Sequence, residues 1–253
     1  SNTTYNTVWQ GDRYAEGYYH VYYVGGVGAS DTNDGLTEET SFATIYRAMK
    51  AAKDKKYLDD VLATAENMHH TKIVLLGDTN ETRQDLRTGA IICGGIVTIT
   101  AKEGVNATVH VGTRATKMAF EFLLLKPRAN GKGYAELNLG EPDMKGTVSF
   151  DCTYFNSGDQ WVDWRAVIRL GDENPDTNSV ARMYDGFSIK NLSYDDVTGN
   201  VIENTNRFVS AIMADYGTFY MYGGTIENCY TNTQPLIFVH SREKTGLGFY
   251  MYG

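Results

Sequence analysis

The stretch FYMYGGTIENC, residues 219–229, is followed by FYMYG, residues 249–253, so that five identical residues recur at a period of 30. Weaker echoes occur at MYDGFSIKN, residues 183–191, and at MKGTVSFD, residues 144–151. Internal periods of 20–50 residues are typical of solenoids and propellers, in which each repeat buries its apolar face against the next repeat. The alternative is a chance recurrence of aromatic residues in a chain that contains 18 tyrosines.

The sequence around this repeat predicts strands. From residue 71 onward, short strand-like runs recur with Gly, Asn and Asp between them, and no second amphipathic helix separates them. Strands without intervening helices exclude a doubly wound α/β fold and leave a sandwich, a barrel or a solenoid. In a solenoid each strand pairs with its counterpart one turn later, about 4.8 Å away, and FYMY would then stack on FYMY. The repeat therefore favours an all-β solenoid.

The chain before residue 71 divides into two segments. Residues 1–20 are polar and aromatic without a clear period, and we expect an irregular lead-in. Residues 21–70 contain a short strand, an acidic turn and a helical region that would cover the open end of a solenoid. Thr40 or Ser41 is expected to cap this helix. One helical stripe comprises Phe42, Ile45, Tyr46 and Met49, and a continuation comprises Tyr57, Leu58, Val61, Leu62 and Ala65.

The segment VYYVGGVGASDTNDGLTEETSFATIYRAM resembles the opening of right-handed parallel β-helix proteins of the pectin-lyase-like superfamily. The GGTIEN pattern is similar to rungs of large secreted β-helix proteins of gut-type Gram-positive bacteria. Ala29 and Ser41 depart from the serine and proline usual in that opening, and the helical region is longer. The matching residues are Tyr23, Val24, Gly28, Asp31, Asn33, Asp34, Gly35, Phe42, Thr44, Ile45 and Ala48. The resemblance implies a β-helix with an N-terminal helical cap, from a superfamily that includes lyases, hydrolases and adhesins.

Composition restricts the partners. The 253 residues carry a net charge of −8, which disfavours general attraction to nucleic acid or to anionic lipid. No apolar run approaches the roughly 20 residues that a membrane helix needs. Three cysteines, Cys93, Cys152 and Cys229, lie in apolar or alternating stretches and are expected to be buried thiols.

The strongest candidate site is DCTYFNSGDQWVDWRAVIRLGDENPD, residues 151–176. Aromatic faces stack on sugar rings, and glycoside hydrolysis uses two carboxyl groups about 5–9.5 Å apart. Asp159 and Asp163 are therefore the candidate catalytic residues. The candidate substrate-binding residues are Tyr154, Trp161, Trp164, Arg165 and Asp172. The alternative is a surface loop whose tryptophans pack on the flank of the fold.

Two further clusters are considered for metals. Asp31, Asn33 and Asp34 offer oxygen ligands that Ca²⁺ accepts, but their spacing does not fit an EF-hand, and turn chemistry explains them without a metal. His69 and His70 are adjacent, so their side chains diverge and a shared metal is disfavoured. We expect this histidine pair to lie in a loop, and no cofactor is expected.

Phosphate-binding and nucleophile motifs are missing from the sequence, which leaves carbohydrate chemistry or binding. We expect an extracellular or cell-surface bacterial protein that acts on glycans, as part of a glycoside hydrolase rather than a polysaccharide lyase. The alternative is a non-catalytic adhesin or stalk. With about 30 residues per turn, a length typical of such repeats, the segment 71–253 would form five or six turns. Further chain or a second subunit would then cover the C-terminal end.

Overall fold

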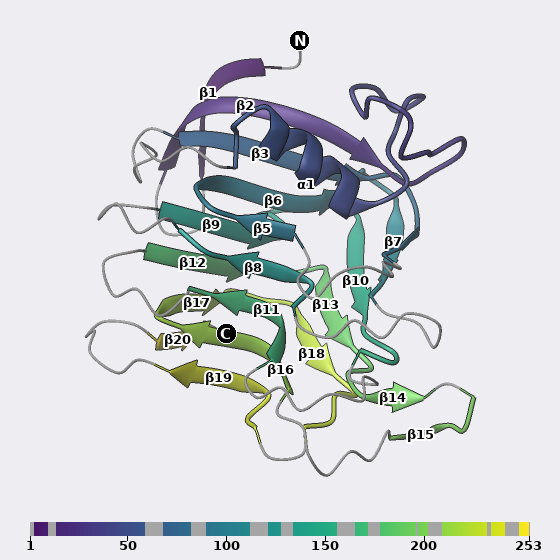
Figure 1. Cartoon of the computed structure of the whole chain (residues 1–253), viewed down its shortest axis with the longest axis vertical. Coiled ribbons are helices and arrows are strands. Elements are labelled where there is room, and N and C mark those ends of the chain that lie inside the picture. The colour runs from purple at the N-terminus through teal and green to yellow at the C-terminus, as the bar shows by residue number, and fades with distance from the viewer. Residues whose placement is uncertain are drawn as a thin grey trace.

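The computed structural model describes the fold over most of the chain. It describes residues 3–9, 14–58, 68–81, 90–111, 121–127, 134–155, 165–171, 178–195, 197–201, 209–231, 234–240 and 248–252. Within these residues the structure is predominantly β, with three sheets of mainly parallel strands and the helix α1. Figure 1 shows strands of successive passes lying side by side from the N-terminal part of the chain to the C-terminal part.

The longest sheet has eight strands, and all its neighbouring pairs are parallel except β1 with β2. In spatial order its strands are β1 (Thr3–Trp9), β2 (Tyr14–Val24), β3 (Met68–Leu75), β6 (Gly95–Ala101), β9 (Tyr134–Leu139), β12 (Asn178–Met183), β17 (Gly217–Met221) and β20 (Gly248–Met251). Apart from β1 and β2, neighbouring strands of this sheet are not consecutive along the chain. Between them the chain leaves the sheet and then returns.

Between successive strands of the eight-stranded sheet, the chain forms the strands of two five-stranded sheets. One contains β4 (Thr79–Asn80), β7 (Asn106–His110), β10 (Thr147–Asp151), β13 (Phe187–Lys190) and β18 (Thr225–Glu227). The other contains β5 (Ala90–Ile92), β8 (Leu123–Leu125), β11 (Arg165–Leu170), β16 (Val209–Asp215) and β19 (Ile237–His240). A short antiparallel pair is formed by β14 (Tyr194–Asp195) and β15 (Asn200–Val201). In the described part of the chain, 20 strands and one helix form mainly parallel sheets, which confirms the all-β expectation.

The FYMY ladder predicted from the repeat is present. Phe219 pairs with Phe249 and Tyr220 with Tyr250, and both ring pairs are stacked, with centroids 5.4 and 5.3 Å apart. The echo at residues 183–191 is also in register, since Met183 pairs with Met221. Figure 1 shows the participating strands β12, β17 and β20 in consecutive positions.

The period read from the two FYMYG copies applies only to the last interval of the long sheet. One row of directly paired residues runs through Val97, Leu137, Ala181, Phe219 and Phe249. The sequence separation between neighbours in this row is unequal, and the last separation is the shortest. The single period predicted for all turns was therefore too short for the passes from β6 to β17, and too long for the pass from β3 to β6, where Thr71 pairs with Val97. Register is fixed by strand pairing, whereas the connections between strands differ in length without disturbing it.

The N-terminal part differs from the expectation in three ways. Residues 3–9 and 14–20 are strand residues of an antiparallel pair, not an irregular lead-in. Helix α1 (Ile45–Asp54) is capped by Thr44, whose hydroxyl accepts from the Arg47 N–H, so neither Thr40 nor Ser41 is the cap. Phe42 lies before the helix, in a β-bridge with Val24. The helix ends before Tyr57, and its expected continuation falls mainly on residues 59–67, outside the described part.

Two carboxylates hold the start of α1. Asp31 accepts hydrogen bonds from the backbone N–H groups of Ala43 and Thr44. Buried Glu81 accepts from the N–H of Ile45, at 2.5 Å, and of Tyr46. Negative groups at a helix N-terminus satisfy N–H groups that lack intrahelical partners. The helix is thereby tied both to the acidic turn and to the residue after β4, and its apolar face joins the core shared by all three sheets.

The cysteine expectation holds best for Cys152, which is fully buried and whose thiol has its pKa raised well above the ordinary value by burial. Cys93 and Cys229 are partly buried, and burial also raises the pKa of Cys229. All three are free thiols.

Candidate functional site

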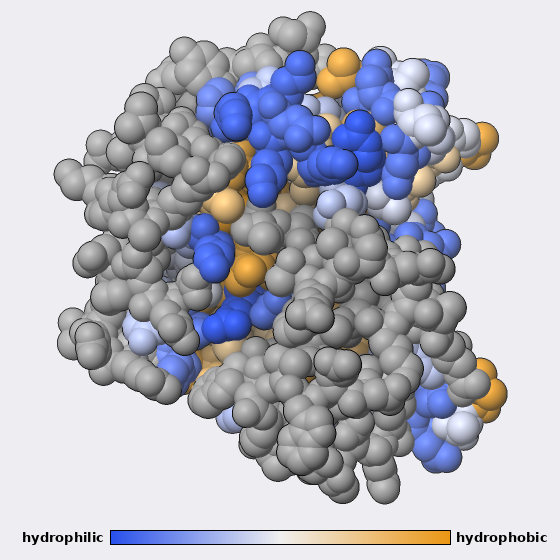
Figure 2. Space-filling view, viewed as in Figure 1, coloured by the Kyte–Doolittle hydropathy of each residue, from blue (hydrophilic) through white to orange (hydrophobic). Residues whose placement is uncertain are grey.

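A charged cluster lies on the outer face of the sheet that contains β8, β11, β16 and β19. In β11, Ile168 and Leu170 are fully buried in the core, so Arg169 between them projects to the opposite face. Arg169 pairs in register with Met213 of β16 and Leu124 of β8. Figure 2, drawn from the same side as Figure 1, shows a band in which hydrophilic and hydrophobic side chains of described residues adjoin.

Arg169 joins two carboxylates, one at the end of β16 and one just before β8. One terminal nitrogen of its guanidinium lies 2.6 Å from Asp215 Oδ2, and the other lies 3.4 Å from Glu121 Oε1. Glu121 and Asp215 are each only 4% exposed, while the Arg169 side chain is 22% exposed. Because both oxygens contact one guanidinium, they are at most roughly 8 Å apart. This limit is compatible with the carboxyl separations of glycosidases, about 5–5.5 Å for retention and about 6.5–9.5 Å for inversion.

His240 extends the cluster. Its Nδ1 lies 2.9 Å from Asp215 Oδ1, so the two oxygens of Asp215 are shared between His240 and Arg169. The His240 ring lies edge-on to Tyr216 and stacked on Phe238, with centroid distances of 6.3 and 5.9 Å. The side chain is 24% exposed, and it therefore lies nearer the solvent than either carboxylate.

The two carboxylates that contact Arg169 stabilise its charged form. Burial by itself lowers the pKa of Arg169, but the hydrogen bond and charge of Asp215, together with Glu121, outweigh it and raise that pKa. A guanidinium held by two carboxylates has little remaining attraction for a third anion. The cluster is therefore poorly suited to an anionic ligand.

Most of the site residues predicted from sequence lie outside the described residues. These are Asp159, Trp161, Asp163, Trp164 and Asp172. Arg165 is the first residue of β11, and Asp172 directly follows Gly171 at the other end of that strand. The predicted segment thus borders the strand that carries Arg169 at both of its ends.

Tyr154 is described and lies elsewhere. It follows β10, is 8% exposed, and its hydroxyl donates a 2.6 Å hydrogen bond to Asp195. Its backbone has a positive φ of 65°, and its N–H donates to the Tyr194 carbonyl. Tyr154 thus secures a turn, and its ring presents little exposed face to a sugar.

The acidic turn uses its side chains internally. Besides the contacts of Asp31 with α1, Asn33 Nδ2 donates to the carbonyls of Gly28 and Ser41. Asp34 Oδ1 accepts from the Thr40 hydroxyl and the Leu36 N–H, and these bonds lower the pKa of Asp34. Among the residues that the structure describes, no group of three or more His, Cys, Asp or Glu side chains is arranged to hold a metal ion.

The histidines at 69 and 70 belong to β3, so the expectation that they lie in a loop was wrong. Their side chains diverge, as expected for neighbours in a strand. His69 Nδ1 lies 2.7 Å from His20 Nε2, while His70 Nε2 lies 2.7 Å from the Thr98 hydroxyl. His20 also stacks on Tyr57. Burial, and to a lesser degree His69, lower the pKa of His20 to about 4.

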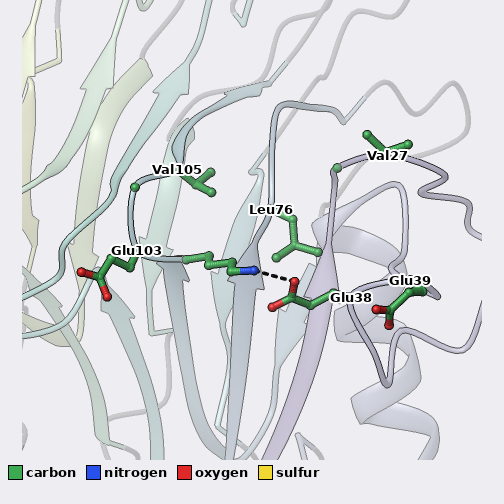
Figure 3. Close-up of a pocket in the computed structure, with 9 residues that line it drawn as sticks. Val27, Glu38, Glu39, Leu76, Glu103 and Val105 are labelled. Carbon is green, nitrogen blue, oxygen red and sulfur yellow. Dashed lines mark hydrogen bonds and ion pairs between the residues drawn. The ribbon is translucent and has the colours of Figure 1, made fainter.

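An open groove of about 560 Å³ lies where the glycine turn before residue 29 approaches the turn after β6. Lys102 crosses it to Glu38, with Nζ 2.6 Å from the carboxylate. Figure 3 shows Glu103 and Glu39 directed away from this ion pair. The groove therefore has acidic residues on its rim but no convergent carboxylates among the residues that line it.

Sequence reasoning missed Glu121, Arg169, Asp215 and His240. They occur singly in apolar runs such as FEFLLL and AIMAD, and 119 positions separate the first from the last. A single charged residue within a buried strand was the available signal, because such a residue needs a partner on a neighbouring strand.

The described helix is not long or apolar enough to cross a membrane. Comparison of the chain with protein-family models, with curated proteins and with solved structures gave no match.

Proposed function

We propose that the three sheets are the faces of a right-handed parallel β-helix of the pectin-lyase-like kind. The support is the recurring order of strands along the chain. β6, β7 and β8 lie one in each of the three sheets, and β9, β10 and β11 follow in the same order, beside β6, β7 and β8 respectively. The stacked Phe219–Phe249 and Tyr220–Tyr250 pairs are the side-chain ladders expected between successive rungs.

On this scaffold we propose a glycan-directed protein that hydrolyses glycosidic bonds outside the cell or at the cell surface. One observation carries the proposal: Glu121 and Asp215 flank a single guanidinium on one sheet face, beside the strand bordered by the predicted tryptophan segment. Two carboxyl groups about 5–9.5 Å apart are the usual chemical requirement of glycoside hydrolysis. Asp159 and Asp163 stay in the proposal as acids of the adjoining segment, with Trp161 and Trp164 as sugar-stacking residues.

The charge of the cluster favours uncharged sugars. Arg169 is already engaged by two carboxylates, and the whole chain carries a net charge of −8. A uronic acid or sulfated glycan would meet excess negative charge, whereas hydroxyl groups can hydrogen-bond to carboxylate, imidazole and guanidinium alike.

A second function is favoured by a different observation. Continuous stacking along the sheets, including the Tyr184–Tyr222–Tyr252 column, is what a stiff rod suited to a surface stalk or adhesin would need. In this proposal the charged cluster is a structural clamp that joins β11, β16 and β19 to the segment just before β8.

The test is incubation of the protein with a panel of neutral, amino and acidic oligosaccharides, with product masses followed over time. Hydrolysis predicts smaller masses that disappear in Glu121→Gln and Asp215→Asn and persist in Glu103→Gln, a matched change of an exposed glutamate. Asp159→Asn and Asp163→Asn determine whether the adjoining segment contributes. Bound but uncleaved ligand would favour a binding module. Neither cleavage nor binding would favour the stalk.

A further inference from the structure

The open groove at the turns that follow β2, β3 and β6 is separate from the charged cluster around Arg169 and shares no residue with it. We propose that this groove binds a linear, cationic segment of a protein partner. In the complex, an aliphatic side chain of the partner lies over the apolar floor, and lysine or arginine side chains lie beside the glutamates of the rim. The inference does not depend on glycan hydrolysis.

Backbone contacts hold the walls of the groove in place. The Gly25 N–H donates to the Phe42 carbonyl, and the Leu76 N–H donates to the Val24 carbonyl, both at 2.8 Å. A Cβ added to Gly25 would lie 2.7 Å from the carbonyl oxygen of Gly77, so the turns after β2 and β3 touch through their backbones. The groove is therefore formed before a partner arrives, and less free energy is lost to ordering when the partner binds.

The floor of the groove is apolar. Leu76 and Val105 are partly exposed, and Val27 is 100% exposed. In the view of Figure 3, Leu76 lies between Val105 and Val27. A fully exposed valine adds nothing to the core, whereas an aliphatic side chain of a partner would remove its surface and that of its two apolar neighbours from water. The floor therefore favours an uncharged, aliphatic side chain.

The rim of the groove is acidic. Three glutamates and one lysine line it, and the lysine is already engaged, since Lys102 Nζ lies 2.6 Å from Glu38 Oε2. This hydrogen bond and the charge of Glu38 raise the pKa of Lys102. Glu39 and Glu103 point away from the ion pair (Figure 3). Hydrogen bonds from its own backbone N–H and from the Thr37 hydroxyl lower the pKa of Glu39, so this carboxylate is charged at neutral pH.

A second lysine does not cancel the charge of the rim. Lys145 is 3.8 Å from Glu103, but the two side chains are 70% and 76% exposed, so solvent and salt screen the pair. Asp78, two residues beyond Leu76, adds an exposed carboxylate beside the wall. The chain as a whole also carries a net charge of −8. Opposite charge accelerates encounter and selects the partner, so the rim favours a lysine-rich or arginine-rich segment.

The shape of the groove favours an extended chain over a small ligand. Small-molecule sites enclose most of the ligand surface, whereas this groove is open along the turns of three passes. Among the described residues that line it there is no aromatic ring on which a sugar could stack. Glu39 and Glu103 diverge, so they do not converge on one metal ion. Turns on a rigid scaffold are common sites of partner recognition.

The first experiment uses short synthetic peptides with leucine at the centre and lysine, serine or glutamate at the flanking positions. Binding to the whole chain is followed by NMR of the methyl groups of Val27, Leu76 and Val105. We expect the lysine peptide to shift these signals and to bind about tenfold more tightly than the serine peptide, and the glutamate peptide not to bind. Raising the salt concentration from about 0.05 to 0.5 M should weaken the lysine peptide, because exposed charges are screened.

The second experiment separates the floor from the rim. Val27→Ser and Glu39→Gln should each weaken the lysine peptide by about three- to tenfold, and only Glu39→Gln should also reduce the salt dependence. The matched controls are Val197→Ser and Glu227→Gln, which change exposed residues of the same kinds outside the groove. The controls should bind as the wild type does. All four positions are exposed, and circular dichroism verifies that each variant is folded.

The inference would be overturned by equal affinity for the lysine and serine peptides, by unchanged binding in both Val27→Ser and Glu39→Gln, or by no binding of the lysine peptide. Spermine is a cation without an aliphatic side chain, and equal affinity for it at the same methyl groups would reduce the site to charge alone. A dimer that forms with rising protein concentration and is lost in both Glu39→Gln and Lys53→Gln would assign the groove to the lysine-rich end of α1 in a second copy instead. None of these results bears on hydrolysis.

Discussion

Gly171 shows at the scale of one residue how closely the charged cluster is built. It follows β11, has a φ of 85°, and a Cβ added there would overlap the carbonyl oxygen of Asp215. The position therefore needs glycine both for its conformation and for the close approach of β16. The same backbone that excludes a side chain also determines where the Asp215 carboxylate lies.

We expect Gly171→Ala to lower the free energy of unfolding by more than about 3 kcal/mol, because conformational strain and overlap with backbone act together. Gly104→Ala is the matched control, since Gly104 has a similar φ of 76° with no atom within 4 Å of an added Cβ. The control should cost only the strain, about 1–2 kcal/mol. Urea unfolding of both variants measures the difference, and equal losses would contradict the expected overlap.

His20 makes stability depend on pH. Its pKa is about 4 in the folded protein and 6.5 in an unfolded chain, so only the unfolded chain takes up a proton between these values. Stability contributed by neutral His20 is present above pH 6.5 and is lost as the pH falls toward 4. We expect His20→Gln to reduce this pH dependence by about 1–2 kcal/mol, measured by urea unfolding at pH 7.5 and 4.5. An unchanged difference between the two pH values would show that other groups cause it.

At the scale of elements, the ladder of identical residues offers an internal comparison. Phe219 in β17 is fully buried with strands on both sides, whereas Phe249 in β20 is only partly buried. The two side chains have the same chemistry and the same register but are packed to different extents.

Phe219→Ala should therefore lower the free energy of unfolding by about 3–5 kcal/mol, the usual range for a buried phenylalanine. Phe249→Ala should cost less than half as much, because less of its ring leaves water on folding. Equal costs in urea titrations would mean that the last strand is covered as fully in solution as the strand before it.

Elements with a local signal could be predicted from the sequence. The FYMYG repeat gave the pairing of β17 with β20, and the spacing of apolar residues located α1 to within a few positions. The sequence does not indicate the cap at Thr44, because the hydrogen bonds at the start of the helix are partly accepted by the distant carboxylates of Asp31 and Glu81. Glu81 lies 36 positions beyond Ile45. The sequence before Val21 does not indicate a strand, because its aromatic residues do not alternate clearly with polar ones, although backbone pairing makes most of it strand.

At the scale of the whole molecule, the candidate site was predictable only in part. The sequence directed attention to the segment around β11, which borders Arg169. It could not indicate that Glu121, Asp215 and His240 meet there, because they are brought together by parallel register across four strands. That register is set by strand pairing between distant segments, while the connections vary in length from one pass to the next.

A single hydrophobic core runs from Tyr22 in β2 to Phe219 in β17 and includes residues of the eight-stranded sheet and of both five-stranded sheets. Because neighbouring passes share this core, we expect one cooperative unfolding transition. Far-UV circular dichroism, which follows the strands, and near-UV circular dichroism, which follows the tyrosines, should give coincident curves in urea. Two separated transitions would instead indicate that groups of strands unfold independently.

The two FYMYG copies also make the chain amenable to clean excision. Removing residues 219–248 would join Gly217 and Thr218 to the second copy, and the junction would read GTFYMYG as it does now. Since Phe249 occupies the same row as Phe219, the shortened chain could place its remaining aromatic residues directly on β12 without any new sequence at the join. The removed residues include β18 and β19, so the shortened chain would lose His240 from the charged cluster while the aromatic ladder kept its register, and the stacking of the scaffold and the composition of the cluster could be altered separately.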